Sequence, residues 1–414
     1  MRKMKDSGIE WIGQIPQDWE TIRAKYVTTI TNGSDPKTEG NVPVYGSGSG
    51  CFKTCGEYKE GPTVLLGRKG TVDIPQYITG NYWNVDTAFD VKTQGDQLDL
   101  EFYYFASTCF DYKYYTATTT LPSMTQTNYG NMHIPFPSID MQQRIVAGLK
   151  EKLEGIDALI AAKEKTNALL KERRQSIIYE AVTKGLNPDA PMKDSGIEWI
   201  GWIPEDWDVF PVKYLLDKNH PYPIGDGDHG MIKADDYLSE GIPYIRVLNL
   251  TWGDGLNLET LVYISEEMNN RIKNSELRPG DILIAKTGAT IGKTAIVPES
   301  LPRSNTTSHV GKITISNNHD PKFFYYVMTS SVIQTQIQVL SAMQSTRPEL
   351  GIDGLRNLLA VVPPVEKQRD IAKYLDYRCA ELNSAITTNA DMIERLKEYR
   401  QSIIYEAVTG KIEV

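Results

Sequence analysis

The sequence has few cysteines and no long apolar run. Four cysteines in 414 residues, Cys51, Cys55, Cys109 and Cys379, are too few for a disulfide framework. No apolar stretch reaches the roughly 18–20 residues that a membrane helix needs. The polar residues after Met1 contain no signal-peptide core. These absences predict a cytoplasmic protein without a membrane contact.

Positive charge is also in short supply, with 44 Lys and Arg against 53 Asp and Glu and a net charge of −9. Binding to DNA is driven largely by neutralisation of phosphates, so this balance does not favour it at first sight. A local basic surface is enough for binding, however. The charge balance therefore leaves nucleic acid open as a partner.

Several short segments resemble catalytic, cofactor-binding or metal-binding motifs, but each lacks a residue or spacing that the motif requires. Residues 288–294 (Gly-Ala-Thr-Ile-Gly-Lys-Thr) have one residue too few between the glycines for a phosphate-binding loop. Residues 219–222 (Asn-His-Pro-Tyr) resemble an amino-methyltransferase motif, but no glycine-rich cofactor loop precedes them. Residues 57–59 (Glu-Tyr-Lys) lack the Pro-Asp of a nuclease, and no Cys or His pair follows Cys51 and Cys55 at zinc-binding spacing. The sequence predicts no catalytic, cofactor-binding or metal site in this chain.

An internal repeat is the dominant feature of the sequence. Residues 4–13 (Met-Lys-Asp-Ser-Gly-Ile-Glu-Trp-Ile-Gly) reappear unchanged as residues 192–201, an offset of 188. Residues 174–183 recur as residues 400–409, an offset of 226, so the second copy is longer by 38 residues. Identical ends around different middles indicate one scaffold that carries two different recognition segments.

Each copy ends in a long stretch with apolar residues spaced alternately by four and three. This spacing is typical of a coiled-coil seam. Each stretch follows prolines and ends before a glycine, Gly185 or Gly410, as a helix would. About 40 helical residues make a rod of roughly 60 Å. The expected seams are Leu149, Leu153, Ile156, Ile160, Lys163, Asn167, Leu170, Arg174, Ile177 and Ala181, and Leu375, Cys379, Leu382, Ile386, Asn389, Ile393, Leu396, Arg400, Ile403 and Ala407.

The segments that precede the two long helical stretches, residues 1–138 and 192–364, contain most of the glycine, proline, aromatic and β-branched residues. This composition predicts mixed α/β (α+β) domains. Strands are expected at residues 63–66 and 281–285, and short helices near residues 102–107 and 322–335. The predicted fold is two such domains joined by two long antiparallel helices that form a coiled coil, with a pseudo-two-fold internal repeat. The expected bounds are 1–138 and 192–364 for the domains and 139–185 and 365–410 for the helices.

This ordered set of motifs resembles the specificity (S) subunit of type I restriction–modification systems. The likeness covers essentially the whole chain. The first domain departs from the pattern after Gly70, where it lacks the counterpart of Gly292. The matching motifs are the opening residues 10–19 and their copy 198–207, the helix entries 137–146 and 363–372, and the strand–turn 280–288 with its partial match 65–70.

The resemblance implies a non-enzymatic subunit with two target-recognition domains that bind double-stranded DNA. It also implies partners: two modification (methyltransferase) subunits and restriction (translocase and nuclease) subunits. S-adenosylmethionine, ATP and Mg²⁺ would be held by those partners and not by this chain. The paired helices near Tyr179 and Tyr405 are the expected docking surface for the modification subunits.

Two kinds of segment recur at corresponding places in both middles and have side chains suited to DNA contacts. One is a turn with lysine or arginine after a strand, and the other is a polar segment before the long helix or its preceding strand. An ordinary solvated loop is the alternative for any single residue. The candidate DNA-binding residues are Arg68, Lys69, Thr118, Thr119, Thr120, Ser123, Gln126 and Asn128 in the first copy and Lys286, Thr287, Lys293, Ser345, Thr346 and Arg347 in the second.

Two different recognition domains on a stiff helix pair predict a bipartite, asymmetric DNA site. The helices would then act as a ruler, and four extra residues in one of them would add about 6 Å and change the spacer length. A coiled-coil adaptor or an acidic DNA mimic that regulates restriction is the alternative function. A mimic would place carboxylates in a continuous array and would not bind DNA.

Overall fold

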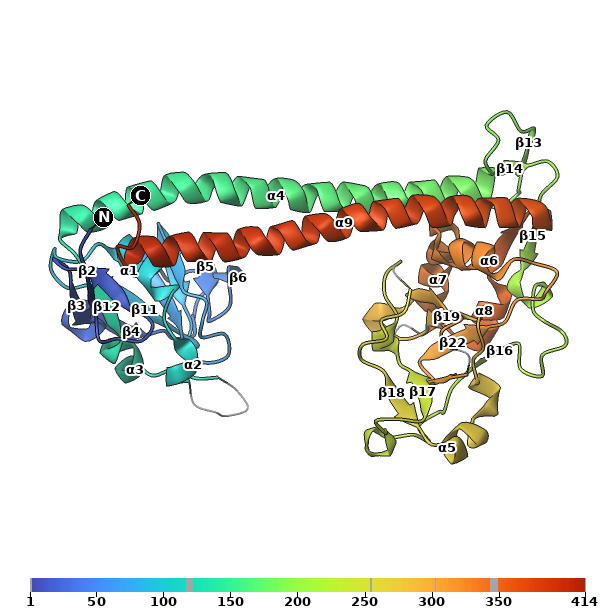
Figure 1. Cartoon of the computed structure of the whole chain (residues 1–414), viewed down its shortest axis with the longest axis horizontal. Coiled ribbons are helices and arrows are strands. Elements are labelled where there is room, and N and C mark those ends of the chain that lie inside the picture. Colours follow the sequence, from blue (N-terminus) through green and yellow to red (C-terminus); the bar gives the residue numbers. More distant parts are fainter. Residues whose placement is uncertain (1, 117–121, 254, 302, 343–348, 414) are drawn as a thin grey trace. The chain divides into compact units, whose positions relative to one another are not determined.

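The computed structural model describes residues 2–116, 122–253, 255–301, 303–342 and 349–413. The chain forms two compact units (Figure 1). Unit 1 comprises residues 1–164 and 390–414, and unit 2 comprises residues 165–389. Each unit therefore contains one mixed α/β region and a segment of both long helices. The domain bounds expected from the sequence refer to the α/β regions alone and stay predictions.

Unit 1 is built on a four-stranded antiparallel sheet of order β4-β11-β8-β9. A second sheet, β6-β5-β10-β7, and the pairs β1-β2 and β12-β3 complete its strands. The elements are β1 (Met4–Asp6), β2 (Gln14–Pro16), β3 (Glu20–Arg23), η1 (Ala24–Tyr26), β4 (Thr28–Asn32), β5 (Val42–Tyr45), β6 (Cys51–Cys55), β7 (Lys59–Glu60), β8 (Thr63–Gly67), β9 (Gln76–Ile78), β10 (Asn81–Asn84), β11 (Ala88–Thr93), α1 (Leu100–Ser107), α2 (Tyr112–Tyr115), α3 (Gln126–Asn131) and β12 (His133–Phe136).

Unit 2 repeats this plan. Its four-stranded antiparallel sheet has the order β16-β22-β19-β20, next to the sheet β18-β17-β21 and the pairs β13-β14 and β15-β23. The elements are β13 (Met192–Asp194), β14 (Trp202–Pro204), β15 (Asp208–Pro211), η2 (Val212–Tyr214), β16 (Ile224–Asp226), η3 (Ala234–Asp236), β17 (Ile242–Ile245), η4 (Val247–Asn249), β18 (Val262–Ile264), α5 (Glu266–Arg271), η5 (Lys273–Ser275), β19 (Ile282–Ala285), η6 (Gly288–Thr290), β20 (Thr294–Ile296), β21 (Asn305–Thr306), β22 (Val310–Ile313), α6 (Pro321–Thr329), α7 (Ser331–Ala342), α8 (Ile352–Asn357) and β23 (Leu359–Val362).

The internal repeat is thus also a repeat of topology. Strand β8 lies between β11 and β9 as β19 lies between β22 and β20, and both strands are completely buried, as short runs of apolar residues predict. The expected helix at residues 322–335 is wrong in one respect, because it is two helices separated at Ser330. There the backbone is extended and the Ser330 hydroxyl donates to the carbonyl of Val327, a local bond that competes with helix continuation.

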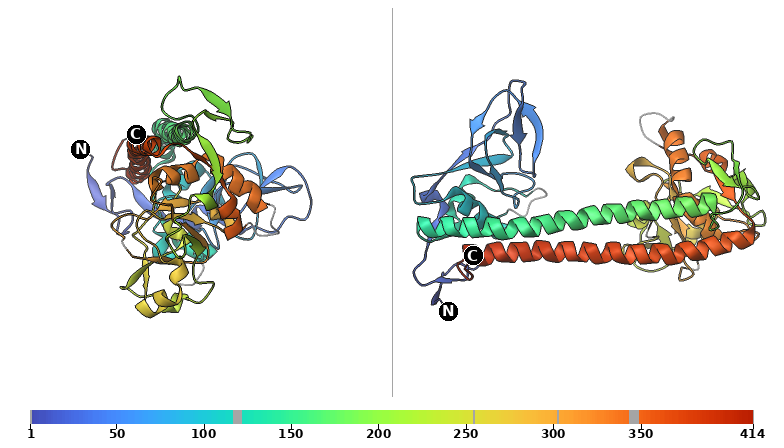
Figure 2. Two further views of the ribbon diagram at one scale, coloured as in Figure 1. Left: turned by 90° about the vertical axis from the view of Figure 1, so that its right-hand side faces the viewer. Right: turned by 90° about the horizontal axis from the view of Figure 1, so that it is seen from above.

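The two long helices are α4 (Ile139–Lys184) and α9 (Val365–Val408), and a segment of each lies beside the other within each unit (Figure 2). In unit 2, Asn167 donates to the carbonyl of Ile386, and Arg174 donates to Asn383 further along. Numbers rise on one helix as they fall on the other, so the predicted antiparallel pairing is confirmed.

The predicted seam is confirmed as the less exposed side of both helices. Near the ends it merges with the cores of the units, where Leu149 and Leu153 meet Ile403 and Ala407 in unit 1. In the middle the seam residues, such as Ile160, are only half-buried. Where the two helices pack only on each other, less apolar surface is buried than where an α/β region also packs on them.

The repeated opening motif packs on the end of a long helix in each unit. Gly185 and Gly410 follow the helices with φ of +75° and +69°, as glycine caps do. A Cβ at Gly410 would lie 2.9 Å from the ring of Trp19, and one at Gly185 would lie 3.0 Å from the ring of Trp207. The glycines therefore supply both the left-handed turn and the room for the tryptophans. In unit 1 this brings Lys411 beside the repeated opening motif, since its ammonium group donates to the carbonyl of Ile12.

A buried glutamine joins each α/β region to its long helix. Gln142 accepts from the amide of Asp99 at 2.8 Å and donates to the carbonyls of Gln97 and Pro137. Gln368, its counterpart at the 226 offset, accepts from the amide of Asp320 at 2.9 Å and donates to the carbonyl of Pro363. Both aspartates cap the helix that follows them. The glutamines hold the caps of α1 and α6 against the long helices.

Beside each glutamine lies an ion pair with the charges exchanged. Glu101 on α1 pairs with Lys150 on α4, whereas Lys322 on α6 pairs with Asp376 on α9, both at 2.6 Å. The hydrogen bond that Lys150 donates to Glu101 raises the pKa of Lys150. Each α/β region is therefore electrostatically matched to the long helix on which it packs.

We expect Gln142→Ala to lower the free energy of unfolding by about 2–4 kcal/mol, because it leaves the Asp99 amide and two carbonyls buried without partners. Urea denaturation followed by circular dichroism measures the change. Gln143→Ala is the matched control, since Gln143 is exposed on the next position of the same helix. Equal stability of the two variants would contradict the anchoring role of Gln142.

In the part of the chain that the structure describes, no helix is both long enough and apolar enough to cross a membrane.

Candidate nucleic-acid interface

In unit 1 the predicted arginine–lysine turn follows β8 directly, and the side chain of Tyr129 is hydrogen-bonded to its backbone. The Tyr129 hydroxyl donates to the carbonyls of Gly67, at 2.7 Å, and Val72, at 3.1 Å. Gly70 continues the turn with a φ of +83°. Lys69 is exposed at its tip, whereas Arg68 is half-buried, 5.9 Å above the ring of Phe89. The turn therefore presents one freely accessible cation and one that is partly used in packing.

The polar segment of unit 1 docks on this turn. The amide of Met124 donates to the carbonyl of Arg68, and the amide of Gly70 donates to the carbonyl of Pro122, both at 2.9 Å. Lys69 and Ser123 thereby form an isolated antiparallel bridge. Two stretches that are about 55 residues apart in the sequence are thus brought side by side, as one surface of exposed and half-buried polar side chains.

The remaining candidates of unit 1 are partly engaged within the protein. Gln126 donates to the carbonyl of Ile30 at 3.1 Å, and Asn128 donates to the carbonyl of Tyr115 at 3.1 Å. The amide of each side chain is thus oriented by the fold. Thr118, Thr119 and Thr120 lie outside the described residues.

In unit 2 the structure places Lys286, the counterpart of Arg68, inside the protein. Lys286 follows β19, but its ammonium group forms a buried ion pair with the carboxylate of Asp226. The second oxygen of that carboxylate lies 3.1 Å from Nε2 of His229. Any contact of Lys286 with a DNA phosphate would require this ion pair to open. The sequence could not distinguish the two lysine-bearing turns because the partner of Lys286 is 60 residues away.

The docking of a polar segment on the turn recurs in unit 2. The amide of Leu350 donates to the carbonyl of Lys286 at 2.8 Å, and Thr287 bridges to Glu349. The Thr287 hydroxyl lies 3.1 Å from Nδ1 of His309, and Lys293 is half-buried at the end of the turn. Ser345, Thr346 and Arg347 lie outside the described residues.

Both turns form the same kind of bridge to their docked segment, but the side chains at the bridge differ. Lys69 and Ser123 in unit 1 correspond to Thr287 and Glu349 in unit 2. The first pair offers a cation and a hydroxyl, and the second offers a hydroxyl and a carboxylate. Surfaces with such different donors and acceptors select different base edges.

Sequence reasoning missed the buried carboxylates that tie strands and loops together within the two α/β regions. In unit 2, Asp228 accepts from the hydroxyl of Tyr244 at 2.8 Å and from the amides of Ile232 and Ser308. Burial alone would raise the pKa of Asp228, but these hydrogen bonds outweigh it, and the pKa lies below its ordinary value. The glycine-rich run at residues 225–228 was the available signal, because a Cβ at Gly227 would lie 1.9 Å from the carbonyl of Thr306.

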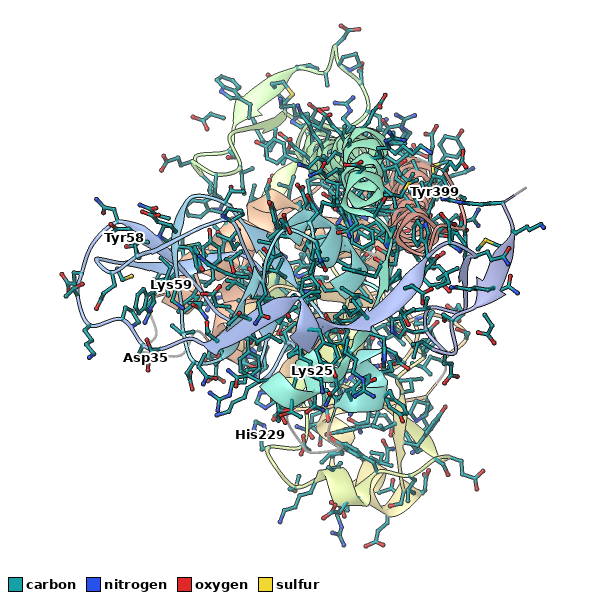
Figure 3. The ribbon with its side chains drawn as sticks, turned by 90° about the vertical axis from the view of Figure 1, so that its left-hand side faces the viewer. Lys25, Asp35, Tyr58, Lys59, His229 and Tyr399 are labelled. Carbon is teal, nitrogen blue, oxygen red and sulfur yellow. The ribbon has the colours of Figure 1, made fainter. Side chains whose placement is uncertain are left out.

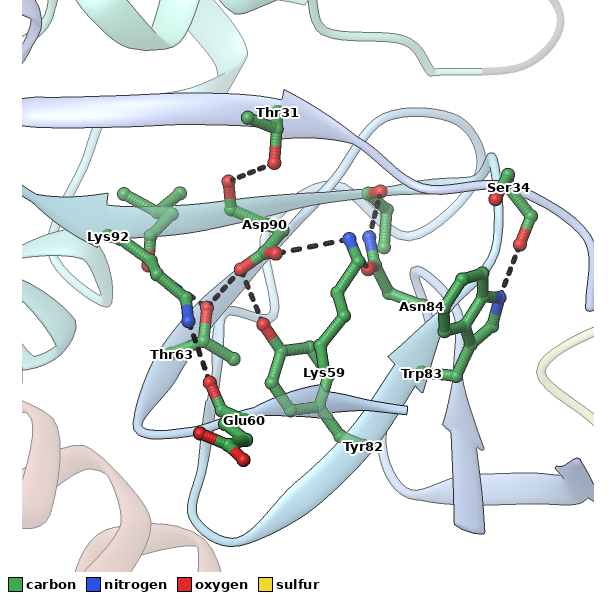
Figure 4. A network of polar contacts seen from close by, with 12 residues as sticks. Thr31, Ser34, Lys59, Glu60, Thr63, Tyr82, Trp83, Asn84, Asp90 and Lys92 are labelled. Carbon is green, nitrogen blue, oxygen red and sulfur yellow. Dashed lines mark hydrogen bonds and ion pairs between the residues drawn. The ribbon is translucent and has the colours of Figure 1, made fainter. Parts of the chain in front are cut away.

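Asp90 has the same role in unit 1, where Figure 4 shows the network around it. Its carboxylate accepts from the hydroxyls of Thr63 and Tyr82 and pairs with Lys59 at 3.1 Å. Burial raises the pKa of Tyr82, which keeps this hydroxyl a donor. Lys59 also donates to Asn84 at 2.8 Å, so it links β7, β10 and β11.

The Glu-Tyr-Lys run at residues 57–59 is structural. Glu57 accepts from the hydroxyl of Thr38 and from the amides of Lys37 and Thr38, and these bonds lower its pKa to about 2. Lys59 faces Asp90 instead, while the side chain of Tyr58 is exposed at the outer edge of unit 1 (Figure 3). The carboxylate and the ammonium group serve two separate contacts and form no common site.

A metal site is absent from the residues that the structure describes, where no three His, Cys, Asp or Glu side chains gather closely enough to hold an ion. The cysteines are all free.

Two α/β units that repeat one turn-and-segment surface with different side chains, each on a pair of long helices, define a two-part recognition subunit. The family model for the type I restriction modification DNA specificity domain matches residues 16–171 and 204–392. The chain therefore belongs to the type I restriction–modification DNA specificity family.

Relatives support this assignment. The chain is 26% identical over 329 residues to the type I restriction enzyme EcoBI specificity subunit of Escherichia coli, covering 78% of this chain and 68% of that one. It is 23% identical to the MjaIX specificity subunit of Methanocaldococcus jannaschii, covering 97% and 95%. A solved chain from work on complex assembly and conformational transition of the type I R-M system has the same fold, with a TM-score of 0.66 at 16% identity over 96% of this chain and 99% of that one.

Proposed function

We propose that this chain selects the DNA target of a type I restriction–modification complex and has no catalytic role of its own. The observation that carries the proposal is the turn with its docked segment, built once in each unit. Lys69 and Ser123 stand where the other unit has Thr287 and Glu349. Because the two surfaces differ in chemistry, the DNA site would be bipartite and asymmetric, with unread base pairs between its halves.

The proposed partners are those expected for this family. Two modification subunits would dock on the paired helices near Tyr179 and Tyr405, and restriction subunits would join that core. S-adenosylmethionine, ATP and Mg²⁺ would be bound by those subunits. The hydroxyl of Tyr405 donates to the carbonyl of Ile12 at 3.2 Å and that of Tyr179 to the carbonyl of Ile200 at 3.4 Å, so both ends of the helix pair are held alike.

Mapping of methylated bases tests the function directly. The chain is produced together with its modification subunit in a host without this system, and methylated positions are located by single-molecule sequencing. We expect one two-part motif with different halves and a spacer of constant length. Binding to the modification subunit without any DNA methylation or DNA affinity would instead indicate an adaptor or a DNA mimic.

We expect Lys69→Ala to weaken binding of the assembled complex to all DNA sequences alike and to lower the salt slope of binding by about 1, as loss of one phosphate contact does. The half-site sequences should stay the same. Arg23→Ala is the control, because Arg23 is exposed on β3 of the same unit, outside the turn. A salt slope equal to that of the unaltered complex would contradict a phosphate contact by Lys69.

A further inference from the structure

A groove of about 700 Å³ lies in unit 2 between α4, α7 and the turn that follows Lys286. We call it the Trp252 groove. The turn contributes Ala289, Ile291, Gly292 and Thr294 to its lining, and α4 contributes Lys171, Arg174 and Gln175. The groove is thus continuous with the candidate interface of this unit. Of its described lining residues none is Asp or Glu, and the polar ones include Gln175, Thr294, Ser331, Gln334 and Gln338.

The loop that carries Trp252 is held on α4 by Arg174. The Arg174 guanidinium donates to the carbonyl of Trp252 at 3.0 Å and to the side chain of Asn383 on α9. Gly253 adopts a φ of +87°, and a Cβ there would lie 2.6 Å from the guanidinium, so only glycine allows this approach. Trp252 also bridges to Thr294 at the start of β20.

The side chain of Trp252 remains 54% exposed although its backbone is held on both sides. Because the backbone at Trp252 is already ordered, a ligand that packs on the exposed indole does not bear the entropic cost of ordering that backbone. Aromatic faces of this kind are used to stack on or pack against nucleotides.

Lys171 gives the groove a positive charge. Comparison of the two repeats shows that the lysine at this position is ion-paired in one copy and, among the described residues, not in the other. The counterpart of Lys171 at the 226 offset is Lys397, which pairs with Glu394 one turn away at 2.9 Å. The position that corresponds to Glu394 is Ala168. Lys171 is exposed and forms no ion pair with any part of the chain that the structure describes.

We propose that the Trp252 groove binds the DNA strand beside the half-site that unit 2 reads, with Lys171 on a phosphate and Trp252 against a nucleotide. The proposal rests on the proposed function and assigns to helix α4 a direct contact with DNA. A cation, several amide and hydroxyl groups and an exposed indole next to the recognition turn are together suited to a phosphodiester backbone with an accessible base.

The test compares matched variants of the chain in complex with its modification subunit. Lys171→Gln is compared with Lys397→Gln, and Trp252→Ala with Trp202→Ala, whose tryptophan is 60% exposed on β14. Affinity for the methylated motif is measured by fluorescence anisotropy at several salt concentrations. We expect Lys171→Gln to lower the salt slope by about 1 and Trp252→Ala to weaken binding about 5- to 100-fold. Lys397→Gln and Trp202→Ala should match the unaltered complex.

Several results would overturn the proposal. One is wild-type affinity and slope for both groove variants with the methylated motif intact, in which case the proposed function stands and the groove contact is wrong. Another is weaker assembly of Trp252→Ala with the modification subunit in the absence of DNA, which would make the groove a protein-docking surface. An unaltered complex that selects no DNA sequence would overturn the proposed function and the groove contact together.

Discussion

Insertion of seven residues into both long helices, after Glu164 in α4 and after Asn389 in α9, is expected to lengthen the DNA spacer by two to three base pairs. Seven residues are two helical turns, so the seam keeps its alternation of four and three and the helices still pair. Two turns add about 10 Å along the helix axis. Both helices run from one unit into the other, so the added length falls between the two recognition surfaces.

Methylated-base mapping measures the spacer length. The half-site sequences are expected to stay unchanged. An insertion of the same length in the exposed turn between Gly48 and Ser49 is the control, because it leaves both helices unchanged. Circular dichroism checks that the long helices are retained. An unchanged spacer, or altered half-sites with the old spacer, would show that the helices do not set the separation.

Lys286→Met is expected to lower the free energy of unfolding by about 3–5 kcal/mol, as loss of one partner of a buried ion pair does. The change removes the ammonium group but keeps a side chain of similar length. Among the described residues, the buried Asp226 carboxylate then keeps His229 as its remaining ion-pair partner. Lys293→Met is the control, since Lys293 belongs to the same turn but is half-buried. Its effect should stay within about 0.5 kcal/mol.

The double variant Asp226→Asn with Lys286→Met should recover more than half of the lost stability, because both charges are then gone. Chemical denaturation gives both free energies. The same variants also decide the role of Lys286, which the sequence places among the DNA-binding candidates. If Lys286→Met keeps full stability and lowers only the affinity for DNA, the lysine leaves the ion pair to act at the DNA.

Some features could be predicted from the sequence because they depend on local spacing or on the repeat. The long helices follow from the alternation of apolar residues, and their ends follow from Gly185 and Gly410. The buried strands β8 and β19 follow from short runs of apolar residues between turns. The break at Ser330 could not be predicted with the same rules, because a single hydroxyl–carbonyl contact decides it.

What the sequence by itself determined is the architecture: two copies of one scaffold, two long antiparallel helices and a family likeness carried by motifs at fixed positions. Each of these depends on periodicity, or on identity between the copies, and both can be read along a single chain. Only the tertiary structure decided which side chains of the two turns face outward.

Lys69 is exposed and Lys286 is buried, although both lie in the same kind of turn. In the sheet order β16-β22-β19, Asp226 at the end of β16 lies on the far side of β22 and pairs with the Lys286 ammonium group across that strand. Likewise only the fold brings the Trp252 loop to Arg174 on the long helix α4. Long-range contacts set the charge available at each surface, and no local pattern records them.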